Sequence, residues 1–196
     1  NYNFLFANGK SNNLSYKVTL NRNSTDQPIY PRSGSDMIFS VQLTPPYAAF
    51  RSADTDYKNM SDQEKYKWIE YHKWTFKSDI YTKIIGDLVL RTSANFGYLG
   101  RYNKDLGYSP FEGFQLGGDG MSGGSYTYAT EIIGLRGYDN GALTPYSDGY
   151  AYTRMSAELR YPLLMENSTI IYALAFVEGG NAWDSIGKFN PFDLKR

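Results

Sequence analysis

The sequence predicts an all-β protein, an incomplete antiparallel transmembrane β-barrel with long extracellular loops. Three observations support this fold class. Apolar and polar residues alternate along segments of roughly nine to eleven residues, the length that a tilted strand needs to cross a bilayer. Charged residues lie in the middle of the polar faces of these segments, and aromatic residues lie near their ends. The connections between the segments alternate between short and long, as in outer-membrane barrels.

The alternation predicts about six strands. From Asn13 to Asn23 the even positions are apolar and the odd positions are polar, and from Ser35 to Thr44 only Ile38 breaks the pattern. The segment from Thr169 to Trp183 is mostly apolar on both faces until Glu178, so alternation does not give its orientation. The other expected strands, which alternate clearly, are 72–80, 87–98 and 151–161.

A soluble antiparallel sandwich predicts the same alternation, so other features must decide between the two. A water-filled barrel interior accommodates whole charges in mid-strand, and a membrane interface attracts aromatic rings to strand ends. The mid-strand charges are Lys17, Asp36, Lys73, Lys77, Arg91, Arg154 and Glu158. The aromatic residues near strand ends are Trp74, Tyr98, Tyr150, Tyr161 and Trp183. Both sets favour the membrane barrel.

The connections predict which end of the barrel is which. Outer-membrane barrels place short turns on the periplasmic side and long loops outside. The short connections are Ser24–Gly34, Gly86–Asp87 and Leu163–Ser168. In the long connection from Pro45 to about Trp68, Ser61 and Glu64 form a capping-box pattern that predicts one helical turn. Because six strands cannot close a membrane barrel, we expect residues 1–196 to be an incomplete C-terminal barrel domain without the first and last strands.

Composition excludes several function classes. The chain has 20 basic and 20 acidic residues, so it lacks the basic surface expected of a nucleic-acid-binding protein. It has no cysteine, which excludes thiol catalysis and cysteine-bound zinc, and its single histidine, His72, leaves almost no material for histidine relays. The carboxylates of the long loop lack the spacing of a calcium-binding loop. We expect no cofactor, no metal site and no catalytic residue.

Three other functions are alternatives to consider: dinucleotide binding, hydrolysis and passive transport. Gly118, Gly120 and Gly123 match the spacing of a dinucleotide-binding motif, but SYTYAT follows where an amphipathic helix is required, so we interpret the glycines as a mobile loop. An outer-membrane hydrolase is the second, with His72 as its only candidate base, yet no serine has a recognisable nucleophile setting. A porin or transporter is a stronger alternative, because interior charges of both signs suit a channel.

The stretch GLRGY, from Gly134 to Tyr138, resembles the (V/L)RG(F/Y) motif in the sixth extracellular loop of the BamA superfamily, the outer-membrane assembly and two-partner secretion barrels. Three other landmarks occur in family order: the periplasmic turn IYPRSGS (29–35), the glycine-rich FQLGGDGMSGG (114–124) and the late strand FVEGGNAW (176–183). The resemblance covers essentially the whole chain, as strands eight to thirteen of about sixteen. TPPYAAF and EYHKW are most similar to Bacteroidota-type sequences.

The resemblance implies a structural role for the arginine of this motif. In the family the loop folds back into the lumen, and its arginine contacts acidic residues that match Glu158 and Glu178 here. A guanidinium suits this role because it stays charged when partly desolvated and offers a planar fork to carboxylates. The expected loop-six residues are Gly134, Leu135, Arg136, Gly137 and Tyr138, with Gly134 and Gly141 as flexible flanks. The alternative is a solvated, unpaired Arg136.

The resemblance also implies a function. The chain resembles part of a non-enzymatic outer-membrane protein insertase, which is the central barrel of the assembly machinery in the outer membrane of Gram-negative bacteria. The implied partners are nascent outer-membrane proteins, accessory machinery subunits and outer-membrane lipids including lipopolysaccharide, with no nucleic acid. Periplasmic POTRA modules would precede the barrel. The alternative is a two-partner secretion barrel or another outer-membrane transporter or porin, and the number of POTRA modules would separate insertase from secretion barrel.

Overall fold

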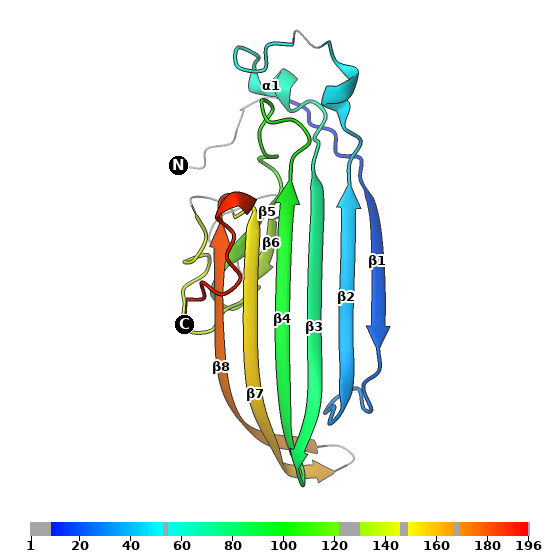
Figure 1. The fold of residues 1–196 in the computed structure, drawn as a ribbon, viewed down its shortest axis with the longest axis vertical. Helices are drawn as coiled ribbons and strands as arrows, with labels where there is room; N and C mark the ends of the chain where they lie inside the picture. Colours follow the sequence, from blue (N-terminus) through cyan, green and yellow to red (C-terminus); the bar gives the residue numbers. More distant parts are fainter. Residues whose placement is uncertain (1–8, 53–54, 122–129, 146–148, 167–168, 196) are drawn as a thin grey trace.

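A computed structural model of the chain describes residues 9–52, 55–121, 130–145, 149–166 and 169–195. Its main element is one antiparallel sheet of six strands in the order β1-β2-β3-β4-β7-β8 (Figure 1). The strands are β1 (Tyr16–Asn23), β2 (Gly34–Leu43), β3 (His72–Ile85), β4 (Leu88–Gly100), β7 (Ala151–Glu166) and β8 (Thr169–Trp183). All six predicted strands are therefore present, and each pairs with its neighbour in sequence among these six.

The strand ends differ from the sequence prediction in places. β3 continues to Ile85, past the expected end at Ile80, and β4 continues to Gly100. The predicted turn from Leu163 is wrong at its start, because β7 continues to Glu166. A register shift between Pro162 and Leu164 absorbs the proline, which has no N–H to donate, and lets the pairing with β8 resume.

Cross-strand pairing separates a polar face from an apolar face. Lys77 lies opposite Asn95, and Asn95 lies opposite Arg154, so one row of polar residues crosses β3, β4 and β7. Phe76 and Phe96 lie opposite each other on the other face. Large apolar residues on that face are exposed in β1, β2, β3, β7 and β8, and they include Val18, Leu20, Phe39, Trp74, Leu159, Tyr161, Ile171 and Val177. Alternation therefore predicted the two faces correctly.

The register fixes the orientation of β8, which alternation left open. Ser156 lies opposite Glu178, and Glu158 lies opposite Phe176. Glu178 is therefore on the polar face, together with the aromatic and aliphatic side chains of Tyr172, Leu174 and Phe176.

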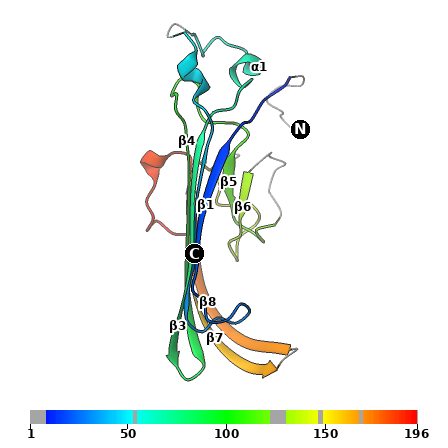
Figure 2. The ribbon, with the colours of Figure 1, turned by 90° about the vertical axis from the view of Figure 1, so that its right-hand side faces the viewer.

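A small second sheet lies on the polar face of the large one (Figure 2). It consists of β5 (Gly113–Leu116) and β6 (Thr130–Ile133), which pair in parallel. The sequence pattern did not predict either strand. An apolar cluster holds this sheet against the wall, with members from the loops as well as the strands: Ile69, Tyr71, Leu99, Phe114, Leu116, Ile133, Leu135, Tyr152 and Ala182. Gly97 allows this packing, because a Cβ there would overlap the Tyr152 ring and lie 2.8 Å from Phe114 Cζ.

The long connection between β2 and β3 contains a short 3-10 helix (Tyr47–Phe50) and α1 (Asp62–Lys65), which begins after Ser61 as the capping-box pattern predicted. The capping contact differs from the pattern, because the Ser61 hydroxyl lies 3.4 Å from the Glu64 carboxylate and makes no side-chain bond to a backbone N–H. In the part of the chain that the structure describes, no helix has the length and apolar character to span a membrane.

The aromatic residues near strand ends divide into two groups. Trp74 and Tyr161 are exposed on the apolar face, as expected for an interfacial girdle. Trp183 is buried, because Phe189 of the following segment packs edge-on against it at 5.0 Å. Tyr150 is a correction to the prediction, because it stacks on Tyr108 at 3.9 Å and packs against the apolar cluster on the polar side.

The three connections predicted to be periplasmic lie at one end of the sheet, the lower end in Figure 1. Gly86 and Asp87 alone link β3 to β4, and the β7–β8 connection is reduced to residues 167–168, which lie outside the described residues. The β1–β2 turn reaches across to β8, because Tyr30 is buried with its ring 5.3 Å from that of Tyr172. The turn is further attached by an Arg32–Asp87 ion pair at 3.0 Å.

Candidate functional site

The predicted loop-six motif follows β6 and turns along the polar face of the sheet. Leu135 donates its backbone N–H to Gly118 O at 3.1 Å and is only 1% exposed, so the residue before the arginine is anchored in the apolar cluster. Tyr138 packs against the same cluster. Between them Gly137 has a φ of 86°, in the region that favours glycine, and this lets the chain reverse directly after Arg136.

The glycines that match a dinucleotide motif have a packing role here. Gly118 and Gly120 have positive φ angles of 78° and 76°. Asn140 lies directly over Gly118, and a Cβ on Gly120 would come 3.0 Å from the backbone nitrogen of Gly134. This close packing of two backbone segments differs from the mobile loop that we inferred from sequence. The third glycine of the motif, Gly123, lies outside the described residues.

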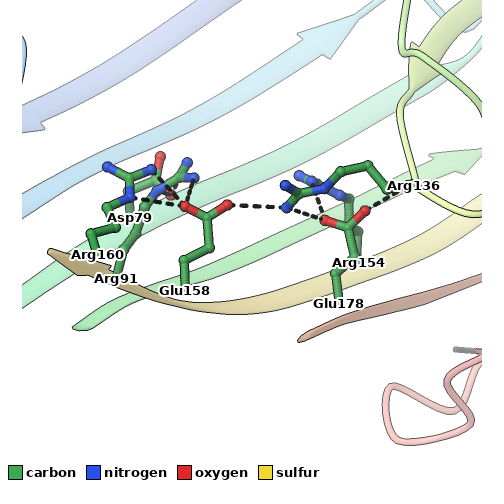
Figure 3. A network of polar contacts seen from close by, with 7 residues as sticks. All are labelled: Asp79, Arg91, Arg136, Arg154, Glu158, Arg160 and Glu178. Atoms are coloured by element: carbon green, nitrogen blue, oxygen red, sulfur yellow. Dashed lines mark hydrogen bonds and ion pairs between the residues drawn. The ribbon is translucent and has the colours of Figure 1, made fainter. Parts of the chain in front are cut away.

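Arg136 joins the two acidic residues that the sequence analysis named. Its Nη2 donates to Glu158 Oε1 at 3.1 Å and to Glu178 Oε2 at 2.8 Å, and its backbone N–H donates to Glu178 Oε1 (Figure 3). The two carboxylates are almost fully buried, with side chains 6% and 3% exposed, whereas the arginine side chain is 42% exposed. The alternative of a solvated, unpaired Arg136 is therefore wrong.

Three arginines and one aspartate of the wall complete this arrangement (Figure 3). We call the whole group the tip network, and its members are Asp79, Arg91, Arg136, Arg154, Glu158, Arg160 and Glu178. Glu158 Oε2 accepts from Arg91 Nη1 at 3.2 Å and from Arg160 Nη2 at 2.6 Å. Glu178 Oε2 accepts from Arg154 Nη2 at 3.0 Å. Each buried carboxylate therefore keeps wall partners in addition to Arg136.

Part of this network was not predicted from the sequence. Arg91 and Arg154 were recognised as charges of the polar face, but their partners were not, and Arg160 and Asp79 were not singled out. Arg91 also pairs with Asp79, at 2.7 Å between Nη2 and Oδ1. Alternation predicted the shared face, whereas the contacts depend on the register between β3, β4 and β7, which one sequence does not give.

Phe176 explains why β8 carries large apolar side chains on a polar face. The guanidinium carbon of Arg136 lies 3.5 Å from the centroid of the Phe176 ring, so the ring forms a flat support beneath the cation. Arg160 lies near the rings of Tyr81 and Tyr172, at 5.8 Å and 5.9 Å. These aromatic faces support the arginines of the network and are not lipid contacts.

The electrostatics of the tip network favour a permanent clamp. Hydrogen bonding to Glu178 raises the pKa of Arg136 above its ordinary value, so the guanidinium carries its charge throughout the physiological range. The network holds four arginines and three carboxylates, one positive charge in excess. Among the described residues no cluster of three or more histidine and acidic side chains is placed to hold a metal ion.

His72, the only candidate base for a hydrolase, lies on the apolar face of β3 and away from the tip network. Its Nδ1 accepts from Trp74 Nε1 at 2.9 Å, and its ring packs against Tyr98 and Tyr102. Gly100 lies directly against the ring, and a Cβ there would overlap His72 Cε1. His72 is therefore one of a group of aromatic rings on the apolar face.

A lipid-facing wall, a polar interior and an extracellular loop that re-enters that interior together define a segment of an outer-membrane β-barrel with an inward-folded loop. The model of the Omp85 superfamily domain matches residues 2–196, and the chain belongs to this superfamily. This superfamily is a family of non-enzymatic membrane proteins, and the chain is part of a bacterial outer-membrane β-barrel. No curated protein matches the chain.

Among solved structures the chain is similar to the crystal structure of BamA from Haemophilus ducreyi lacking POTRA domains 1–3. The TM-score is 0.59 at 18% sequence identity, and the match covers 87% of this chain. The likeness supports the fold class predicted from sequence, a partial BamA-type barrel. The matched region spans 30% of the BamA chain, so it concerns only part of that barrel protein.

Proposed function

We propose that the chain is part of an outer-membrane protein insertase, in which loop six acts as a fixed internal brace of the barrel. The observation that carries the proposal is the tip network, in which Arg136 joins Glu158 on β7 to Glu178 on β8. The family match makes the chain a member of the insertase and transporter superfamily. The likeness to the BamA barrel concerns the fold, and the choice of the insertase within the superfamily is our proposal.

The proposed mechanism has no chemical step. A barrel with a weakly paired seam opens laterally, thins the bilayer and offers its strand edge to incoming strands. The seam strands and the POTRA modules would be supplied by the rest of a longer polypeptide. Loop six would keep the wall opposite the opening in shape, because Arg136 ties β7 and β8 to the loop while the apolar cluster ties the loop to β4, β7 and the residues just before β3.

The proposed partners are nascent outer-membrane proteins, accessory subunits of the assembly machinery and outer-membrane lipids including lipopolysaccharide. The exposed apolar face of the sheet supports contact with lipid. A two-partner secretion barrel is the alternative, because it shares the loop motif. The number of POTRA modules encoded upstream of Asn1 would favour one of the two.

Depletion of the full-length protein tests the function directly. We expect the levels of many different outer-membrane β-barrels to fall together, because each needs the insertase. If barrel levels stay constant and a single secreted protein accumulates in the periplasm, the secretion barrel is the better assignment. Arg136→Ala in the full-length protein should lower barrel levels without abolishing them, because the wall carboxylates keep Arg91, Arg154 and Arg160.

A further inference from the structure

A second group of charges attaches the inward-folded segment to the wall on the side of β3. Lys73 Nζ lies 3.3 Å from Glu112 Oε2 and 3.9 Å from Glu131 Oε2. Lys77 Nζ lies 2.9 Å from Glu131 Oε1. The two lysines belong to β3, whereas Glu112 directly precedes β5 and Glu131 lies in β6. We call these four residues the base anchor.

The base anchor is buried at its centre. Lys73 is 8% exposed and Glu112 is 4% exposed, so this pair is shielded from solvent. The ammonium of Lys73 also lies 5.0 Å from the centroid of the Phe114 ring in β5. Burial raises the pKa of Tyr71 to about 12, so its hydroxyl stays protonated, and it forms a hydrogen bond with Glu112. A buried charge requires such partners, which indicates that the pair is part of how the segment docks.

The tip network and the base anchor have their charges arranged in opposite ways, and they lie at different levels along the strands. In the tip network the loop supplies the cation and β7 and β8 supply the carboxylates, whereas in the base anchor the wall supplies the cations. Lys73 lies opposite Leu99 of β4, and Glu158 lies opposite Arg91 of the same strand. At about 3.4 Å per residue these levels are roughly 27 Å apart along the strand.

We propose that Lys73, with Lys77, is a positioning residue that fixes the direction in which β5, β6 and the loop tip at Arg136 lie along the wall. One ionic anchor leaves a segment free to pivot about it. Two anchors of opposite sign at different depths allow one docked orientation, because a reversed segment would bring like charges together at both. The inference concerns docking alone and holds whichever transport or assembly function the barrel has.

A charge exchange tests the pairing in the full-length protein in outer-membrane vesicles. The variants are K73E, E112K and the double variant K73E/E112K, and the readout is amide hydrogen exchange of Gly113–Leu116. We expect each single variant to speed exchange about tenfold or more, because it leaves a buried charge among like charges. The double variant should restore exchange to within about threefold of wild type, since the pair is re-formed with its signs exchanged.

Two controls make the result specific. K83E changes the same charge on the exposed part of the same strand and should leave exchange of Gly113–Leu116 unchanged. K73R keeps the cation and should stay close to wild type. Unchanged exchange in K73E, or a double variant no better than the single ones, would overturn the proposal.

A milder set of variants covers the case in which K73E is not recovered from the membrane. K73Q, E112Q and K73Q/E112Q keep the side-chain volumes and remove the charges. If the two residues act as a pair, the double variant exchanges no faster than the faster single variant. Fully additive effects on exchange would show that the two residues act independently and would reject the pairing.

Discussion

Glu178→Gln tests how the tip of loop six is held. In the structure Glu178 Oε1 accepts the backbone N–H of Arg136, and Oε2 accepts from Arg136 Nη2 and Arg154 Nη2. Glutamine has almost the same shape but only one acceptor oxygen, and its NH2 group must face at least one of these donors. The substitution therefore removes hydrogen bonds to the loop without leaving a cavity.

The magnitude follows from the bonds that are lost. A hydrogen bond to a charged group contributes about 1.5–3 kcal/mol, and two of the three bonds at Glu178 belong to Arg136. The Arg136 side chain is 42% exposed and keeps Glu158, so we discount the sum to about 2–3 kcal/mol. This corresponds to roughly 30- to 140-fold faster opening of the loop tip.

Glu158→Gln is the matched comparison. Glu158 gives the loop one bond, through Oε1, whereas its Oε2 bonds go to the wall arginines Arg91 and Arg160. A glutamine can keep its amide oxygen toward the wall, so we expect the loop tip to open only a few times faster, for a cost of about 1 kcal/mol. Glu166→Gln, at the exposed lower end of β7, serves as the control.

The assay is amide hydrogen exchange of residues 134–138 in the full-length protein in outer-membrane vesicles. The expected order of exchange rates is Glu178→Gln, then Glu158→Gln, then Glu166→Gln and wild type together. An equal effect of the first two variants would show that the backbone bond of Arg136 contributes nothing. No effect in either would refute the clamp, and with it the brace that we propose for loop six.

Two further predictions concern packing and pH. Gly97→Ala should weaken docking of the inner sheet by about 1–3 kcal/mol, seen as faster exchange of Gly113–Leu116, because the new methyl group overlaps the Tyr152 ring. Burial raises the pKa of Glu70, so the stability of the 44–71 loop is full below the ordinary pKa of 4.5 and declines as pH rises through the raised value. The protection factor of this loop, which is the intrinsic amide exchange rate divided by the observed rate at the same pH, should therefore be higher at pH 5 than at pH 8, and Glu70→Gln should remove the difference.

The wall could be predicted from sequence because its signal is local. Alternation over one strand reports which side chains share a face, and the turn residues Gly86 and Asp87 report where two strands meet. Details that depend on pairing were wrong, such as the continuation of β7 through Pro162, where one extra residue in β7 shifts its register with β8. The orientation of β8 likewise became clear only through its register with β7.

The inner sheet could not be predicted, because its signal is not local. β5 and β6 have four residues each, too few for a period, and their parallel pairing joins Gly113 to Thr130 across a long intervening segment. The same holds for the charges that dock them. Lys73 was placed on the polar face from sequence, but Glu112 and Glu131 reach it only once the segment has folded back.

Apolar contacts and ionic contacts hold different parts of the segment that folds back onto the wall. The apolar cluster holds β5, β6 and Leu135, whereas Arg136 itself, one residue further on, is held by ions and the Phe176 ring in a partly wet interior. Apolar burial stabilises a contact without fixing its direction, whereas a hydrogen-bonded charge pair stabilises the contact and also fixes its direction. Loss of the ionic clamp should therefore release the tip and leave the inner sheet docked, so that loop mobility and barrel stability change separately.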